Sequence, residues 1–431
     1  MVAASTRVQV LVPLRVALAL YGLTGAAALA QARPDTARGT PPGRDTTQRR
    51  DTSRVRDTTA TRDRIGDLNA GAVAGGAFPG SFVLPGTNVS LGIGGFVKVL
   101  AYHDSDADER APEFAPADLA PNVNGGGTYS MTANVSRVFL DVRTTTERQT
   151  DVRAYTEIDF NGPSVVKLRH AYLRLRTPDV EVRAGQTWST FMNAAAKPDL
   201  LGEAATSGLA ELRQTQIRFT NHVSRELHPS VSIENPSSSD VGGEVEATRT
   251  PAPDVVLSVA YEGANASRVQ LAGVGRRLQV VLADGSTPST NAWGAQLSFS
   301  VEPAPRHVVR AEGLVGDGIG RYLQGLDAAG AGFVSPDGDI DTRHAWGASA
   351  SYEQPWSATL RSVLVAGTAS ATTPAYVGAG AFDRSDLLAV NLLWRASRYT
   401  TIGIEYAYGQ RRNVDAPSRH NHQVVLGLQL F

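Results

Sequence analysis

The segment that decides the fold is the last one, Gln423-Val424-Val425-Leu426-Gly427-Leu428-Gln429-Leu430-Phe431. Every second residue from Val424 to Leu430 is apolar, which is the period of a β-strand with one apolar face. A soluble domain usually ends in a frayed, polar terminus. An aromatic residue that closes an alternating strand is instead typical of the last strand of a bacterial outer-membrane barrel. The segment therefore predicts a closed transmembrane β-barrel.

The same alternation continues upstream through about 340 residues. Leu388, Val390, Leu392 and Trp394 share one face of a segment, opposite Asn391. The polar faces carry charges of both signs, which suits a water-filled lumen better than a soluble sandwich. We predict an all-β antiparallel barrel of sixteen strands, near 91–102, 131–146, 150–161, 165–177, 179–190, 213–226, 230–236, 241–250, 254–262, 291–302, 307–315, 342–353, 359–371, 385–396, 400–410 and 420–431.

Connections between these segments alternate in length, as in outer-membrane barrels. Short turns contain proline, which lacks a donor for the sheet; they are predicted at Thr177-Pro178-Asp179, His228-Pro229-Ser230, Thr250-Pro251-Ala252-Pro253, Glu302-Pro303-Ala304-Pro305 and Gln354-Pro355. Long loops are expected at 103–130, 191–212, 263–290, 316–341 and 372–384. By its place between the fifth and sixth strands, the 191–212 loop is the one that folds inward in general porins.

Two segments precede the predicted barrel domain, which spans 79–431. Residues 1–30 have Arg7, an apolar stretch and Ala28-Leu29-Ala30, the build of a secretory signal peptide. Residues 31–78 repeat Asp-Thr among arginines and have few large apolar residues, so they predict a disordered periplasmic spacer. The spacer is also a candidate for peptidoglycan contact.

Composition excludes several classes of function. The chain has no cysteine, 42 glycines and 23 prolines, so disulfide or thiolate chemistry is absent and a helical bundle is disfavoured. The formal net charge of −1 gives no indication of nucleic-acid binding.

Several sequence segments, in this order along the chain, resemble the DcaP-type trimeric outer-membrane porins. They include Leu168-Arg169-His170-Ala171-Tyr172, Gly185-Gln186-Thr187-Trp188-Ser189-Thr190-Phe191-Met192 and Arg213-Gln214-Thr215-Gln216-Ile217-Arg218-Phe219-Thr220. The resemblance implies a homotrimeric porin in the bacterial outer membrane, in contact with lipid and lipopolysaccharide, that passes small hydrophilic, mostly anionic solutes such as dicarboxylates. Two features depart from the family pattern. The coiled coil of some relatives is absent, and the apolar residues of the last strand lie on the opposite face from Phe431.

Anion preference needs fixed cations in the lumen, and arginine suits carboxylates because its fork bonds both oxygens. Strand parity predicts that the lumen-facing charges are Arg137, Arg143, Arg169, Arg183, Arg218, Asp141, Glu157 and Asp159. Strand four leaves an ambiguity, because Arg169 and Arg174 have opposite parity. Mixed charges that only keep the lumen wet are the alternative interpretation.

The constriction loop is predicted to contribute Trp188, Phe191, Met192, Pro198 and Glu203. The aromatic residues there could line the solute path or anchor the loop by packing. Trp394, Tyr406, Tyr408 and Phe431 are assigned to interfacial aromatic girdles. Phe431 is also expected to close the barrel near Phe96, either facing inward or shifted by a bulge.

Other functions stay open as alternatives. A barrel enzyme such as a lipid hydrolase would use neighbouring His170 and Ser189, and a structural anchor would have a plugged lumen. The acidic runs at 104–109 and 337–341 resemble calcium loops but lack the rest of an EF-hand. We therefore predict no catalytic residue, no cofactor and no metal site.

Overall fold

The computed structural model describes residues 75–107, 114–119, 126–162, 165–378, 380–415 and 417–431. The predicted signal peptide and the spacer up to residue 74 lie outside the described residues. Ahead of the predicted boundary at 79, Gly75 already bridges to Phe82, and the Ala77 amide donates to Ser90 Oγ at 2.8 Å. Within the described ranges, no helix has the length and apolar content needed to cross a membrane.

The described chain is almost entirely β-strand. The strands are β1 (Ser81–Val83), β2 (Ser90–Ala107), β3 (Gly126–Thr132), β4 (Arg137–Thr145), β5 (Asp151–Gly162), β6 (Val165–Arg176), β7 (Val180–Trp188), β8 (Arg213–Asn221), β9 (Leu227–Glu234), β10 (Val241–Gly242), β11 (Ala247–Arg249), β12 (Asp254–Glu262), β13 (Arg268–Val281), β14 (Ser289–Ala304), β15 (His307–Asp317), β16 (Gly332–Val334), β17 (Ile340–Thr342), β18 (His344–Pro355), β19 (Leu360–Ala371), β20 (Phe382–Arg395), β21 (Thr400–Asn413) and β22 (Arg419–Leu430). Five short 3-10 helices lie in loops: η1 (Pro116–Asp118), η2 (Ala194–Ala196), η3 (Ala264–Ala266), η4 (Gly320–Tyr322) and η5 (Ala375–Val377).

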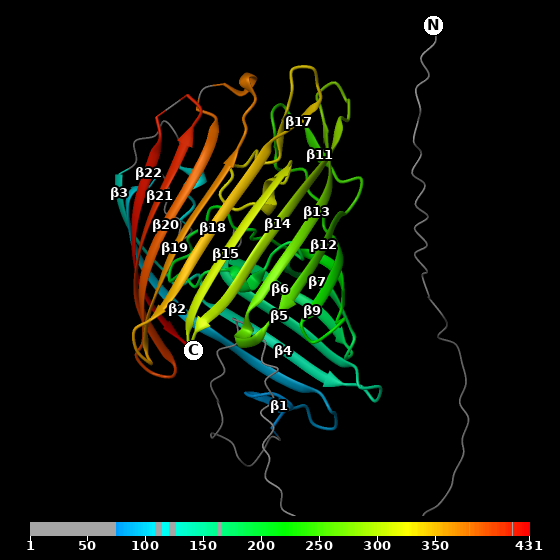
Figure 1. The fold of residues 1–431 in the computed structure, drawn as a ribbon, viewed down its shortest axis with the longest axis vertical. Helices are drawn as coiled ribbons and strands as arrows, with labels where there is room; N and C mark the ends of the chain where they lie inside the picture. Colours follow the sequence, from blue (N-terminus) through cyan, green and yellow to red (C-terminus); the bar gives the residue numbers. More distant parts are fainter. Residues whose placement is uncertain (1–74, 108–113, 120–125, 163–164, 379, 416) are drawn as a thin grey trace, which may run out of the picture. The chain divides into compact units, whose positions relative to one another are not determined.

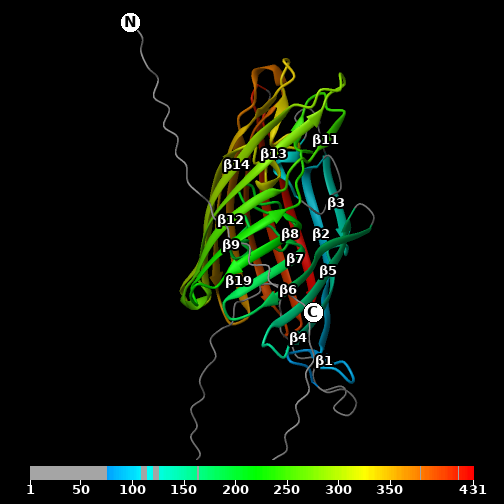
Figure 2. The same cartoon turned by 90° about the vertical axis from the view of Figure 1, so that its right-hand side faces the viewer.

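Neighbouring strands pair in antiparallel order, and β22 pairs with β2 from Val97↔Leu430 to Asp104↔Gln423, which closes the barrel. β3 and β4 together form one interrupted strand along β2, and β11 and β12 form another along β13. β1 is a short addition to β2, and β10, β16 and β17 form a separate three-stranded sheet. The remaining strands form the predicted sixteen-stranded barrel (Figures 1 and 2).

The eighth and ninth strands differ from the prediction. Residues 268–281, expected in a loop, form β13, whereas the predicted strand 241–250 contains only the loop strand β10 and the short β11. The two errors cancel in the strand count. Pro251 and Pro253, expected in a turn, lie at the break between β11 and β12, where no ladder donor is needed. Pro229, expected in a turn, lies inside β9.

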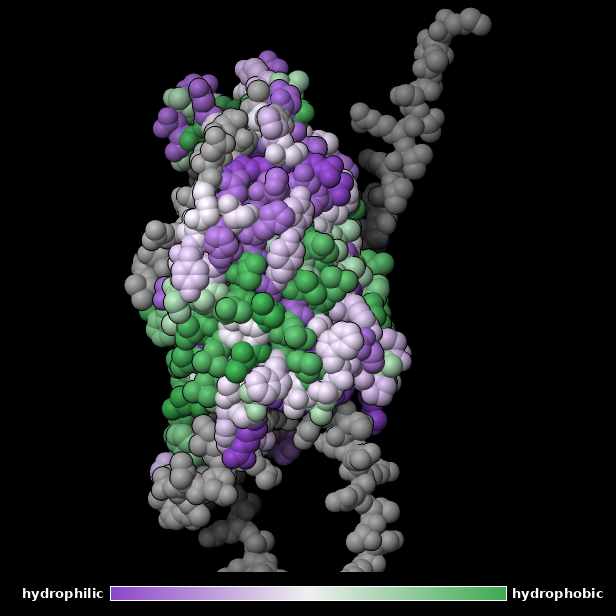
Figure 3. All heavy atoms as spheres, turned by 90° about the vertical axis from the view of Figure 1, so that its left-hand side faces the viewer, coloured by the Kyte–Doolittle hydropathy of each residue, from purple (hydrophilic) through white to green (hydrophobic). Residues whose placement is uncertain are grey.

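Alternate residues face lipid and lumen. Leu426 and Leu428 on β22 are 55% and 46% exposed, whereas Glu405 on the neighbouring β21 is 1% exposed. Figure 3 shows the resulting apolar band across the face formed by β20–β22, with hydrophilic surface beyond it. Lipid therefore contacts aliphatic side chains, while polar side chains are sheltered inside.

Phe431 has the parity of the inner face. Its ring packs edge-on against Phe96 at 6.0 Å, and Arg137 lies 5.3 Å from the Phe96 ring. Phe431 therefore belongs to the inner rim of the barrel and not to an outer aromatic girdle, because the register of β22 continues without a bulge. Trp394 and Tyr406 are exposed on the outer face, as predicted.

Candidate functional site: a basic channel lining

The 189–212 loop between β7 and β8 lies inside the barrel. It reaches inner-face residues of distant strands: the Ala210 amide donates to Glu312 on β15, and the Leu201 and Gly202 amides donate to Glu405 on β21 at 2.6 and 2.9 Å. At the near end, the Thr190 amide donates to Glu234 on β9 at 2.8 Å. These bonds hold the loop across the lumen.

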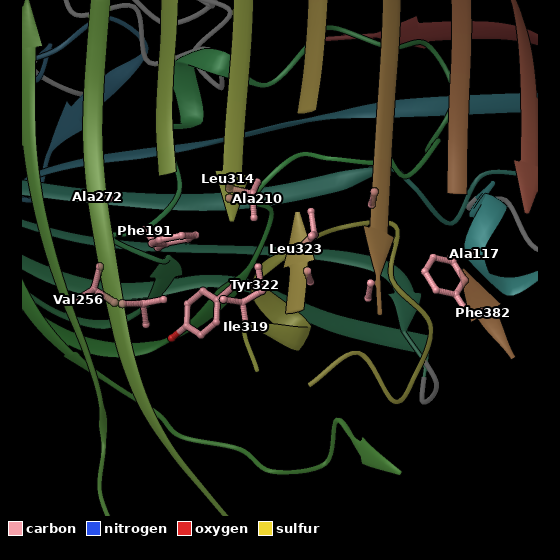
Figure 4. Close-up of a cluster of buried hydrophobic side chains, with 14 residues drawn as sticks. Ala117, Phe191, Ala210, Val256, Ala272, Leu314, Ile319, Tyr322, Leu323 and Phe382 are labelled. Carbon is pink, nitrogen blue, oxygen red and sulfur yellow. The ribbon is translucent and has the colours of Figure 1, made fainter. Parts of the chain in front are cut away.

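Part of the lumen is filled by apolar packing. Phe191 is fully buried, and its ring meets Tyr322 from the loop after β15 at 5.5 Å. Both belong to a cluster that joins loop residues to the inner faces of β12, β13, β15 and β18–β20 (Figure 4). Met192 and Pro198 are also buried. Phe191 and Met192 therefore anchor the loop and do not line a solute path.

The opposite wall, formed by β4–β8, is charged. Three of its strands, β4, β7 and β8, have 9 residues each, and β5 and β6 have 12 each, against 14 to 16 in β13, β14, β20 and β21. All eight charged residues predicted to face the lumen lie on its inner side: Arg137, Arg143, Arg169, Arg183, Arg218, Asp141, Glu157 and Asp159.

The predicted fourth strand is β6, and a bulge in it explains why its arginines occur at both odd and even positions. Glu157 pairs with His170, but the next residue, Ile158, pairs with Leu168, so Arg169 is the extra residue. Arg169 and Arg174 consequently both point into the lumen, although five positions separate them. A one-residue bulge reverses the parity of a strand beyond it.

The register brings five arginines into one line. Arg143 lies opposite Arg153, Arg153 opposite Arg174, Arg174 opposite Arg183, and Arg183 opposite Arg218. We call these five residues the arginine row. The sequence prediction missed Arg153 and Arg174 as members, because only the cross-strand register aligns them with the others.

Two carboxylates partly neutralise the arginine row. Asp141 contacts Arg143 and Arg153 at 2.5 and 2.9 Å, and Glu181 contacts Arg183 at 2.8 Å. Arg218 donates instead to Gln216 and to the Trp188 carbonyl, and among the described residues it forms no ion pair. The arginine row therefore keeps a net positive charge.

A second group of cations lies where the 189–212 loop meets β2 and the β4–β8 wall; one of them, Lys197, belongs to the loop itself. We call Lys98, Arg137, Arg169, Lys197 and Arg213 the basic cluster. Arg169 contacts Glu157 and Asp159 at 3.0 and 2.5 Å, and Lys98 contacts Glu203 at 3.4 Å. Trp188 lies between two of the cations, 4.2 Å from Arg213 and 5.5 Å from Lys197, so this ring is part of the basic surface.

The residues considered for a hydrolase site, Ser189 and His170, bind different partners. Ser189 Oγ donates to Glu234 at 2.6 Å, whereas His170 Nδ1 lies 3.1 Å from Thr187 Oγ1. Across the part of the chain that the structure describes, no group of three His, Asp or Glu side chains is placed to hold a metal ion.

A closed antiparallel barrel with an apolar outer face, a charged inner face and an inward loop defines an outer-membrane channel of the porin class. The family model of the DcaP outer membrane protein matches residues 119–426. The chain belongs to this family of outer-membrane proteins.

Solved structures show the same fold. The outer membrane channel DcaP of Acinetobacter baumannii is 19% identical, with a TM-score of 0.69 over 79% of this chain and 97% of that one. The anion-selective porin from Comamonas acidovorans is 10% identical, with a TM-score of 0.55 over 79% and 99%. OmpT of Vibrio cholerae is 12% identical, with a TM-score of 0.51 over 81% and 99%. No curated protein matches the chain.

Proposed function

We propose that this porin is a passive diffusion channel for small hydrophilic solutes with a preference for anions, dicarboxylates in particular. The arginine row is the observation that carries the proposal. Like charges directly opposite one another destabilise a sheet. Four successive arginine pairs in one register line are therefore costly to the fold, and an anion pathway accounts for them.

The chemistry of the lining supports this preference. Fixed cations in a pore raise the local concentration of anions and lower their barrier to entry. Arg218 offers its guanidinium without a competing carboxylate among the described residues. Arg183 stays partly accessible, with 23% of its side chain exposed, and can offer a second fork to the other end of a dicarboxylate.

The test replaces Arg183 and Arg218 together by alanine and measures the reversal potential in a planar bilayer under a KCl gradient. The expected result is a shift toward cations, because two fixed charges leave the row. The matched control is Arg277→Ala on β13, an exposed outer-face arginine bonded to Asn291 and Ser289, which should leave selectivity unchanged. An unaltered reversal potential in the double variant contradicts the assignment.

The proposed assembly is a homotrimer, as the family resemblance implies. The outer faces of β6, β8 and β9 carry exposed apolar residues, among them Leu173, Ile217 and Ile233, which suit contact with lipid or a second copy. Light scattering of the detergent-solubilised protein should give three times the mass of one chain, and the mass of one chain would contradict the trimer.

A further inference from the structure

The 189–212 loop presents two acidic side chains to the basic cluster: Glu211, which pairs with Lys197, and Glu203, which pairs with Lys98. The backbone on both sides of Glu203 is fixed. The Leu201 and Gly202 amides donate to Glu405, and the Ala205 amide donates to the Phe114 carbonyl at 2.9 Å. A Cβ at Gly202 would come within 2.9 Å of Glu405 Oε1, so a side chain at this position would have to shift the Glu405 carboxylate. The position of Glu203 is therefore built into the fold.

The carboxylate itself is held loosely. Its ion pair is with Lys98 Nζ at 3.4 Å, longer than the roughly 2.7–2.9 Å of a strong charge-assisted bond. The Glu203 side chain is 27% exposed, whereas Lys98 is 8% exposed. A carboxylate with one long contact and an open side can be displaced without moving the backbone.

Several cations surround this carboxylate. Burial alone would raise the pKa of Glu203, but Lys98, Arg137, Lys197 and Arg169 outweigh it and hold the pKa below its usual range. Arg137 pairs with Glu157 only at 3.5 Å, and Arg213 forms no ion pair with any described residue. The basic cluster thus surrounds a charged carboxylate that belongs to the protein.

We propose that Glu203 is an internal competitor for the solute: a solute carboxylate displaces it from Lys98 and takes its place in the basic cluster. The inference rests on the proposed anion function. A channel must bind its solute well enough to admit it and weakly enough to release it. The returning Glu203 carboxylate supplies the release, since it re-forms the ion pair as the solute leaves.

The experiment measures block of the single-channel current by succinate in wild-type protein, Glu203→Gln and Asp199→Asn. Both substitutions remove one negative charge from the same loop and keep the size of the side chain. Asp199 pairs with Arg361 on β19, away from the basic cluster, so it is the matched control. We expect the half-blocking succinate concentration to fall about fivefold in Glu203→Gln, the effect of removing a partly exposed competing carboxylate, and to change less than about twofold in Asp199→Asn.

A second comparison keeps the test specific. In a Lys98→Met background, the cation for which Glu203 and succinate compete is gone. Glu203→Gln should therefore have little further effect on succinate block. Equal effects of Glu203→Gln and Asp199→Asn, or no change in either, overturn the proposal, because only the net charge of the loop would then matter. Failure of the proposed function gives a different result: the wild-type reversal potential in KCl alone would show no anion preference.

Discussion

Glu405 shows at the scale of one residue how a buried carboxylate can organise a pore. It is 1% exposed on the inner face of β21 and accepts from the Leu201 and Gly202 amides and from Asn391 Nδ2 at 3.1 Å. Backbone amides inside a barrel must find acceptors, since an unpaired buried donor costs about 1–3 kcal/mol. Glu405 supplies two acceptors at the point where the 189–212 loop reaches the far wall.

Replacing Glu405 by alanine should therefore release the loop. We expect larger and noisier single-channel currents than in wild type, because two amides lose their acceptor and the segment that carries Glu203 is no longer held. Glu405→Gln keeps one acceptor oxygen and should show a smaller effect. Identical conductance and noise in wild type and Glu405→Ala would show that other contacts suffice to fix the loop.

Phe431 illustrates how far a single residue can be assigned from sequence. The contact with Phe96 follows from counting strands, because the last strand must meet the first. The side of the sheet follows from parity, and the contact with Phe96 favours the inner-facing alternative. The outer-girdle assignment rests on aromatic character alone, which does not specify which face a residue takes.

At the scale of elements, the sequence predicts best where alternation is strong. β20, β21 and β22 carry large aliphatic residues on one face, and their existence and register were predictable. β13 was missed because Gly273 and Gly275 interrupt its outer apolar face and Arg276-Arg277 breaks the alternation. Only the pairing with β12 and β14 shows that these residues form a strand.

The bulge in β6 was not predictable for a related reason. A sequence shows arginines of both parities, but the residue at which parity changes depends on the partner strand. The arginine row depends on this shift, since without it Arg174 would face lipid. Candidate arginines could be chosen from sequence, whereas their alignment across five strands could not.

Cysteine accessibility tests the bulge directly, since the chain contains no cysteine of its own. Lys167→Cys and Arg174→Cys, on either side of the bulge, should both react with a water-soluble thiol reagent added to barrels in lipid. Leu168→Cys and Leu173→Cys should be protected by the membrane. Reaction of Leu173→Cys together with protection of Arg174→Cys would mean an unbroken strand.

At the scale of the whole barrel, the two sides of the lumen differ. Loops pack against β12, β13, β15 and β18–β20 in an apolar cluster, so that side is filled. The strands β4–β8 keep their charged inner faces, with the arginine row along them and the basic cluster where they meet β2 and the 189–212 loop. The water path is therefore expected to run along this basic wall, with the 189–212 loop as its other boundary.

This asymmetry makes the account testable with one recording. The measurement is the single-channel conductance of the wild-type protein in a planar bilayer, together with its reversal potential under a KCl gradient. We expect discrete open-channel steps and a reversal potential on the chloride side. A barrel without conductance steps, or a reversal potential on the potassium side, would contradict it.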